Sequence, residues 1–265
     1  MPQDRILYVD TAAWRVERVV KRAAPVHASS TVYRAATPRW VFPVSGVSEF
    51  LLHGQPVLLD GLTVVVLPAG LPYQIHDWHA APSSHMVVSM QPDSPLPSAP
   101  SGARSWTLVP RALWALRLHW RALAQGWGRA VLPEPVLAEP VHALDGAAVH
   151  ASGMAHPAVA RARRFMATRT AAADGKAWSL HDVADASCCS YFHLARLFRA
   201  HTGLCLHTYR ERLRLALALQ RLDEGESDLA ALAHDLGYSS QSHLGSMFRR
   251  GVGVTPAQAR LALQS

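Results

Sequence analysis

With 265 residues, of which 49% are hydrophobic, the chain is long enough for two domains with buried cores, and its composition is not that of a disordered protein. The formal net charge is +7 and it is uneven: residues 1–150 hold 12 basic and 10 acidic side chains, whereas residues 151–265 hold 14 and 9. The larger excess in the second part suits a partner that carries phosphates. No apolar run approaches the roughly 18 residues that a membrane span needs, so we expect no membrane partner.

The first residues and the cysteines favour a cytoplasmic protein. The first ten residues have neither the charged and apolar blocks of a signal peptide nor the pattern of a transit peptide. Three cysteines (Cys188, Cys189 and Cys205) are too few for a disulfide framework, which favours a reducing compartment. We expect these thiols to be small buried residues rather than redox sensors.

The first part of the chain is rich in short β-forming runs. Residues 1–30 are weakly patterned, and the stretch from Trp14 to Lys21 fits a strand or a short helix. From Thr31, apolar and β-branched runs alternate with Gly and Pro, which predicts a small all-β barrel or sandwich. The expected strands are 31–33, 39–42, 47–52, 57–59, 63–67, 73–75 and 85–90, with a hairpin turn at His53-Gly54.

A connecting region follows. Residues 91–104 contain four prolines and are predicted to be a linker, and residues 131–153 contain three more. Between them, residues 110–125 place Leu113, Leu116, Trp120 and Leu123 on one face of a predicted helix. Periodicity cannot tell whether this face meets a second copy of the chain or the chain's own barrel, so both remain open.

The last part of the chain is predicted to be helical and contains two copies of one sequence motif. The first copy runs from Ala184 through Cys188, Ser190, Leu194 and Phe198-Arg199 to Gly203; the second runs from Ala233 through Gly237, Ser239, Leu244 and Phe248-Arg249 to Gly253. An Ala in a short helix, a turn, a capping Ser and a Leu/Phe pair four residues apart are typical of a helix-turn-helix. A helix over 206–222 joins the copies, and the expected caps are Ser179, Ser190, Asp228, Ser239 or Ser240, and Thr255.

Residues 156–260 resemble the DNA-binding domain of the AraC/XylS family of bacterial transcription regulators, most closely from Leu232 to Pro256. The resemblance implies two helices that enter successive major grooves. It places the DNA contacts of the first copy on Tyr191, Phe192, Ala195, Arg196 and Arg199, and those of the second on Ser240, Gln241, Ser242, Gly245, Ser246, Arg249 and Arg250. Arg196 suits guanine, Gln241 suits adenine, and the arginines at the helix ends suit phosphate.

Two residues depart from the family pattern. Cys188 stands at the turn position where the family has Gly, as the second copy does at Gly237, and a non-glycine residue with positive φ costs roughly 1 kcal/mol. Gly245-Ser246 lies where a longer side chain often contacts the bases. We therefore expect the second helix to contribute more to affinity than to sequence discrimination.

Members of this family often carry a cupin-like β-barrel that binds an effector and dimerises, and residues 31–90 resemble it loosely around Leu67–Tyr73. Tyr73 stands where metal-binding cupins have a His, and His76, His79 and His85 are scattered, so we expect no metal and no cofactor. An effector pocket inside the barrel is predicted, with Arg39 or Gln74 as its polar anchor. Some of the following aromatic residues are predicted to line it, although we expect most of them to be core: Trp40, Phe42, Phe50, Tyr73 and Trp78.

The sequence thus predicts a two-domain protein. An all-β cupin-like barrel over residues 1–100 precedes a linker with one helix over 101–155 and an all-α domain with two helix-turn-helix motifs over 156–265. The predicted function is sequence-specific binding of double-stranded DNA by a non-enzymatic regulator, as a homodimer, with a small-molecule effector and, for an activator, RNA polymerase as partners. The alternatives are a cupin-type metalloenzyme fused to a DNA-binding domain and a ligand-free binder whose barrel only dimerises.

Overall fold

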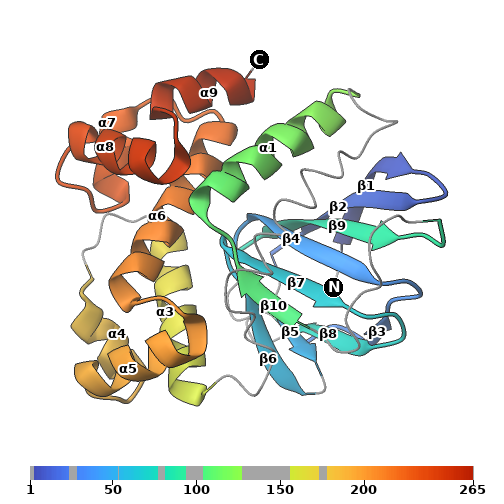
Figure 1. Cartoon of the computed structure of the whole chain (residues 1–265), viewed down its shortest axis with the longest axis horizontal. Helices are drawn as coiled ribbons and strands as arrows, with labels where there is room; N and C mark the ends of the chain where they lie inside the picture. The colour runs from blue at the N-terminus through green and yellow to red at the C-terminus, as the bar shows by residue number, and fades with distance from the viewer. Residues whose placement is uncertain are drawn as a thin grey trace. The chain divides into compact units, whose positions relative to one another are not determined.

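The computed structural model describes residues 3–23, 29–52, 54–76, 81–93, 104–126, 156–172 and 178–264 (Figure 1). Within these ranges the chain divides into two compact units. The first holds the strands and the last turn of the helix that follows them. The second holds residues 108–121 and the helices from Pro157 onward.

The described strands of the first unit form two antiparallel sheets. One sheet has the order β1-β2-β9-β4-β7-β10, and the other has the order β3-β8-β5-β6. The strands are β1 (Gln3–Asp10), β2 (Trp14–Lys21), β3 (Tyr33–Arg34), β4 (Arg39–Ser45), β5 (Ser48–Leu52), β6 (Gln55–Leu59), β7 (Thr63–Leu67), β8 (Pro72–His76), β9 (Ser83–Met90) and β10 (Arg104–Thr107).

Each of the seven predicted β-rich runs overlaps an observed strand. The clearest is β7, whose sequence Thr-Val-Val-Val-Leu is buried along its whole length and is rich in the β-branched residues that pack well in sheets. Leu52 pairs with Gln55, as expected for a hairpin turn at 53–54, and Gly54 has a φ of 75°; His53 itself lies outside the described residues. Residues from both sheets, among them Val41, Phe50 and Val65, form one apolar core.

Three further strands complete the six-stranded sheet. The segment left open between strand and helix is β2, which pairs with β9 from Trp14↔Met90 to Lys21↔Ser83. Strand β1 pairs with β2 at the edge of this sheet. After the proline-rich stretch, most of which lies outside the described residues, β10 pairs with β7 through Arg104↔Val66 and Thr107↔Thr63. The sheet therefore recruits residues on both sides of the predicted strands.

The helical unit contains the helices that the sequence predicts from residue 156 onward. Its helices are α3 (Pro157–Ala172), α4 (Leu180–Ala186), α5 (Tyr191–Thr202), α6 (Leu206–Asp223), α7 (Leu229–Asp235), α8 (Gln241–Val252) and α9 (Pro256–Gln264). In Figure 1, α6 runs between the pair α4/α5 and the pair α7/α8. Each expected cap is present, and Ser240 rather than Ser239 caps α8.

The predicted helix over 110–125 is α1 (Pro110–Ala124), and its four apolar stripe residues are all buried. Its N-terminal half contacts α6 and α8. Arg117 Nη1 lies 2.8 Å from Asp223 Oδ2 at the end of α6, and a Cβ placed on Gly251 of α8 would lie 3.9 Å from Pro110 Cβ. These contacts to the helical unit belong to neither of the two arrangements that the sequence left open.

No helix within the ranges listed above is long and apolar enough to cross a membrane.

Candidate functional site

Helices α5 and α8 present the same faces to solvent. When their capping serines, Ser190 and Ser240, are aligned, the two burial patterns agree at every position except the first and the last. The side chains four and eight residues after each cap are fully buried, namely Leu194 and Phe198 in α5 and Leu244 and Phe248 in α8. Both helices end at a glycine with positive φ, Gly203 or Gly253. The two helices are therefore anchored alike and expose equivalent positions.

The turns that precede these helices share their hydrogen bonds but differ in length. Cys188 N–H donates to Asp185 O and Gly237 N–H donates to His234 O, each at 2.9 Å. Cys188 has a φ of 53° and Gly237 a φ of 73°. The capping serine follows two residues later in the first copy and three in the second, because Ser239 adds a residue before Ser240. The predicted positive φ at Cys188 is confirmed.

Helix α6 holds both copies. Tyr209 is fully buried, and its ring packs edge-on against Phe198 of α5 at a centroid distance of 5.2 Å. Farther along α6, Glu211 accepts a hydrogen bond of 2.6 Å from the hydroxyl of Tyr238, which precedes α8. Burial and the neighbouring Glu211 raise the pKa of Tyr238 well above its usual value, so this phenol stays a donor. One rigid helix thus fixes the positions of α5 and α8.

The predicted DNA contacts lie mostly on the exposed faces. In α5, Phe192 is 84% exposed, an unusual position for a large apolar ring, while Tyr191 and Ala195 are half-buried. Gly245 in α8 is also half-buried, but a Cβ there would meet no atom within 4 Å. The remaining positions are all exposed: Arg196, Arg199, Ser240, Gln241, Ser242, Ser246, Arg249 and Arg250.

In the described part of the chain, the exposed arginines of α5 and α8 form no ion pairs. Arg199, Arg249 and Arg250 lie in the last turns of their helices, and in the described part of the chain none has a carboxylate within salt-bridge distance. The Arg196 Nη2 lies 3.4 Å from His193 Nδ1, and no ion pair of Arg196 is seen among the described residues. These charges are free to meet phosphates or base edges.

The cysteines are not buried, so that prediction is wrong. Cys188 and Cys205 are exposed and Cys189 is half-buried, because each lies at a turn or helix start instead of in the core. Cys205 caps α6, and its sulfur lies 3.0 Å from Thr208 Oγ1. Hydrogen bonds from the Thr208 side chain and from backbone N–H groups lower the pKa of the Cys205 thiol.

A second candidate site is a cavity inside the β-sheet unit. It has about 350 Å³ of empty space, part of which is open to solvent. The strand register explains its lining. Arg5 pairs with Val19, and Val19 pairs with His85; on the other sheet Tyr33 pairs with Tyr73. The lining residues are Gln3, Arg5, Val19, Tyr33, Arg39, Val41, Phe50, Leu67, Tyr73, Ile75, His85 and Val87.

Alternation along the strands decides which of the guessed effector residues line this cavity. Arg39 and Tyr73 line it, as does Phe50. Trp40 and Phe42 project from the other face of β4, where their rings stack on each other with centroids 6.4 Å apart. Gln74 also lies outside the lining, and its side chain donates to Ser30 O at 3.1 Å. Trp78 lies outside the described residues.

Sequence inspection missed the cavity's polar end, which Gln3, Arg5 and His85 provide. Gln3 and Arg5 alternate on β1, and that spacing was the available signal. Among the described residues, no group of three His, Cys, Asp or Glu side chains could hold a metal ion. His76 Nδ1 instead lies 2.8 Å from Ser29 Oγ, and Tyr73 packs against Tyr33 and Phe50. His79 is not in the described ranges.

Comparison with known proteins agrees with these features. Residues 183–262 match a family described as a helix-turn-helix domain. An AraC-like transcription regulator of Streptomyces antibioticus is 30% identical over 234 residues, which cover 88% of this chain and 68% of that protein. A second, of Streptomyces lividans, is 29% identical over 235 residues, with coverages of 88% and 67%.

Among solved structures, ToxT of Vibrio cholerae O395 aligns over 96% of this chain and 100% of its own at 9% identity, with a TM-score of only 0.39, so the assignment depends on the sequence matches. The similarity to the Streptomyces regulators is too long to be confined to the helical unit. The chain belongs to the AraC family of DNA-binding transcription regulators.

Proposed function

We propose that this regulator recognises DNA through α5 and α8 and responds to a small effector held by its β-sheet unit. The observation that carries the first part is the shared burial pattern of α5 and α8. Two helices with the same anchored face and the same exposed face can dock in the same way, one in each of two grooves.

The dimensions suit adjacent major grooves. The 18 residues of α6 span about 27 Å at 1.5 Å per residue. Major grooves on one side of the duplex recur about 34 Å apart, and the packed helices on either side of α6 add to its length. The arrangement therefore fits two half-elements about one helical turn apart.

The exposed side chains suggest how the bases are distinguished. Arg196 can form two hydrogen bonds with a guanine, Gln241 can do so with an adenine, and the ring of Phe192 can contact a thymine methyl group. Arg199, Arg249 and Arg250 at the helix ends suit phosphate contacts that set the orientation.

We assign the sensor and dimerisation role to residues 1–100, a connecting role to 101–155 and DNA binding to 156–265. The two sheets with a cavity between them support a cupin-like barrel that holds the effector. Strand β1 supports a homodimer, because it is an edge strand whose Ile6 and Leu7 are 46% and 50% exposed. Binding of the effector would then change which DNA sites the dimer occupies. If the protein is an activator, it would also contact RNA polymerase. We place it in the cytoplasm, where the DNA lies.

The rival function, a cupin-type metalloenzyme, is less favoured. Tyr73 occupies the ligand position, and its ring is buried between Tyr33 and Phe50 with centroids 5.6 and 5.8 Å away. A phenol held in this way is a poor replacement for an imidazole ligand. The non-enzymatic function is therefore the one we propose.

Selection of bound DNA from a random pool by the full-length protein tests the DNA-binding mode. Wild type should recover two half-elements about one turn apart. Arg196→Ala should relax one half, whereas Ser246→Ala, the change at the equivalent position of α8, should alter the motif little. Binding that fades equally on all sequences as salt rises would contradict sequence-specific recognition and indicate a general electrostatic binder.

A further inference from the structure

Three polar atoms at the cavity of the β-sheet unit are buried without partners. They are Arg39 Nε, Gln3 Nε2 and His85 Nδ1, and within the described ranges none has a hydrogen-bond partner. The Arg39 and Gln3 nitrogens are donors, so each needs an acceptor. Buried donors without acceptors are rare in folded proteins and require an explanation.

The charges around the cavity have one sign. Arg39 and Arg5 both line it, and no lining residue carries a carboxylate. Glu17 pairs with Arg5 at 3.1 Å, whereas Arg39 has no acidic partner among the described residues. Lys21 and Arg5 also lie close enough to His85 to disfavour its protonation, after burial, which is the largest cause. This end of the cavity therefore favours a group that accepts hydrogen bonds and carries negative charge.

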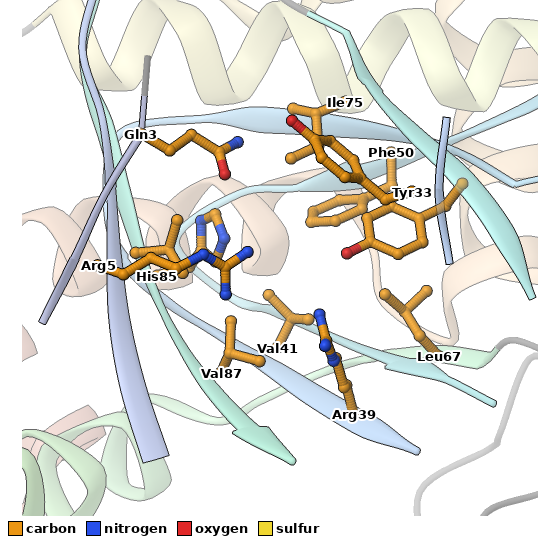
Figure 2. Close-up of a pocket in the computed structure, with 12 residues that line it drawn as sticks. Gln3, Arg5, Tyr33, Arg39, Val41, Phe50, Leu67, Ile75, His85 and Val87 are labelled. Atoms are coloured by element: carbon orange, nitrogen blue, oxygen red, sulfur yellow. The ribbon is translucent and has the colours of Figure 1, made fainter. Parts of the chain in front are cut away.

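The opposite side of the cavity is apolar and aromatic. Figure 2 shows Gln3, Arg5 and His85 on one side, Tyr33, Phe50 and Ile75 on the other, and Arg39 below both groups, at the end away from Gln3. The Tyr73 ring lies 5.6 Å from that of Tyr33 and 5.8 Å from that of Phe50. Aromatic faces at these spacings suit a flat or compact apolar group.

We propose that the effector is a compact organic acid, whose carboxylate is held by Arg39 and whose apolar body packs against Tyr33, Phe50 and Tyr73. This inference deepens the proposed function and rests on it. The enclosed part of the cavity is small, which favours a small acid over a long-chain one. His85 stays neutral and can donate or accept a further hydrogen bond.

Calorimetric titration of the full-length protein with benzoate tests the proposal directly. Benzamide serves as the uncharged counterpart, and acetate supplies the carboxylate without the apolar body. Wild type should bind benzoate at least about 10-fold more tightly than benzamide, because a charge-assisted hydrogen bond in a buried site is worth about one order of magnitude or more in affinity. It should also bind benzoate more tightly than acetate, because acetate lacks the ring that packs against the aromatic side chains.

Variants locate the site. Arg39→Met should weaken benzoate binding about 10-fold or more and leave binding of benzamide nearly unchanged. Arg34→Met is the matched control, because Arg34 is exposed and its guanidinium bonds to Gly70 O at 3.1 Å, away from the cavity. Arg39→Met removes a buried donor that lacks a partner, so thermal unfolding should show no loss of stability.

Equal binding of benzoate and benzamide, or full benzoate affinity in Arg39→Met, would overturn the acid-binding site. A screen of neutral sugars, amides and amines then separates the two proposals. A neutral compound that binds and shifts the preferred spacing of DNA half-elements would leave the effector function standing without the acid. If no compound of any class binds or changes DNA binding, the effector function fails as well.

Discussion

Cys188 is the one non-glycine among the described residues with a positive φ, and replacing it with glycine should stabilise the helical unit. A left-handed conformation costs a residue with a Cβ about 1–2 kcal/mol. About 0.4–1 kcal/mol of this gain is lost, because glycine increases the conformational entropy of the unfolded chain. The Cys188 side chain is exposed, so little packing is lost. We expect Cys188→Gly to raise the free energy of unfolding by about 0.5–1 kcal/mol.

Urea unfolding followed by circular dichroism at a helix-sensitive wavelength measures this change. Cys188→Ala is the control, because it removes the thiol and keeps the Cβ, and it should leave stability nearly unchanged. The reverse substitution, Gly237→Ala, should destabilise by at least about 1 kcal/mol, since its new Cβ would also lie 2.9 Å from Arg214 Nη2. If Cys188→Gly is no more stable than Cys188→Ala, strain at this turn is not the explanation.

Four further measurements test other contacts. Arg117→Met should lower the free energy of unfolding by about 1–3 kcal/mol in urea titrations, because it leaves Asp223 without its 2.8 Å partner. Gly245→Ala should raise the free energy of unfolding by about 0.5–1 kcal/mol, because alanine favours a helix and the new methyl group meets no atom within 4 Å. An unchanged free energy of unfolding would contradict an unstrained helical backbone at Gly245. Cys205, whose pKa is lowered by Thr208, should react with iodoacetamide at neutral pH faster than Cys188, as peptide mass spectrometry can follow. Burial, followed by the charges of Lys21 and Arg5, lowers the pKa of His85 to about 3. Between about pH 6.5 and 3 the unfolded chain therefore binds a proton at His85 that the folded chain does not bind. As the pH falls through this range, the free energy of unfolding should decrease by up to about 1.4 kcal/mol per pH unit, and His85→Gln should remove this part of the decrease.

The helical unit was predictable because its signals are local. A capping serine, a buried Leu/Phe pair and a terminal glycine define α5 within fourteen residues, from Ser190 to Gly203. The same signals recur in α8, where only the choice between Ser239 and Ser240 was open. That choice depends on the length of the preceding turn, which no local propensity specifies.

The cavity was harder to predict because its lining is assembled by strand pairing. His85 meets Arg5 only through Val19 on the strand between them, across 80 residues of sequence. Aromatic content alone favoured Trp40 and Phe42, yet the pleat of β4 turns them away from the cavity. Knowing which faces of β4 and β8 point inward would have selected Arg39 and Tyr73 and excluded their neighbours.

The two copies divide their roles at equivalent positions. Because α5 and α8 are anchored alike, a difference in DNA recognition must come from side chains that occupy the same exposed places. Arg196 corresponds to Ser246 and Phe192 to Ser242, so α5 carries the longer side chains and α8 the shorter ones. A serine reaches fewer base atoms than an arginine does, whereas both helices carry terminal arginines, for which we propose phosphate contacts. The half-element bound by α5 should therefore be the more strongly conserved half of every site that the protein selects.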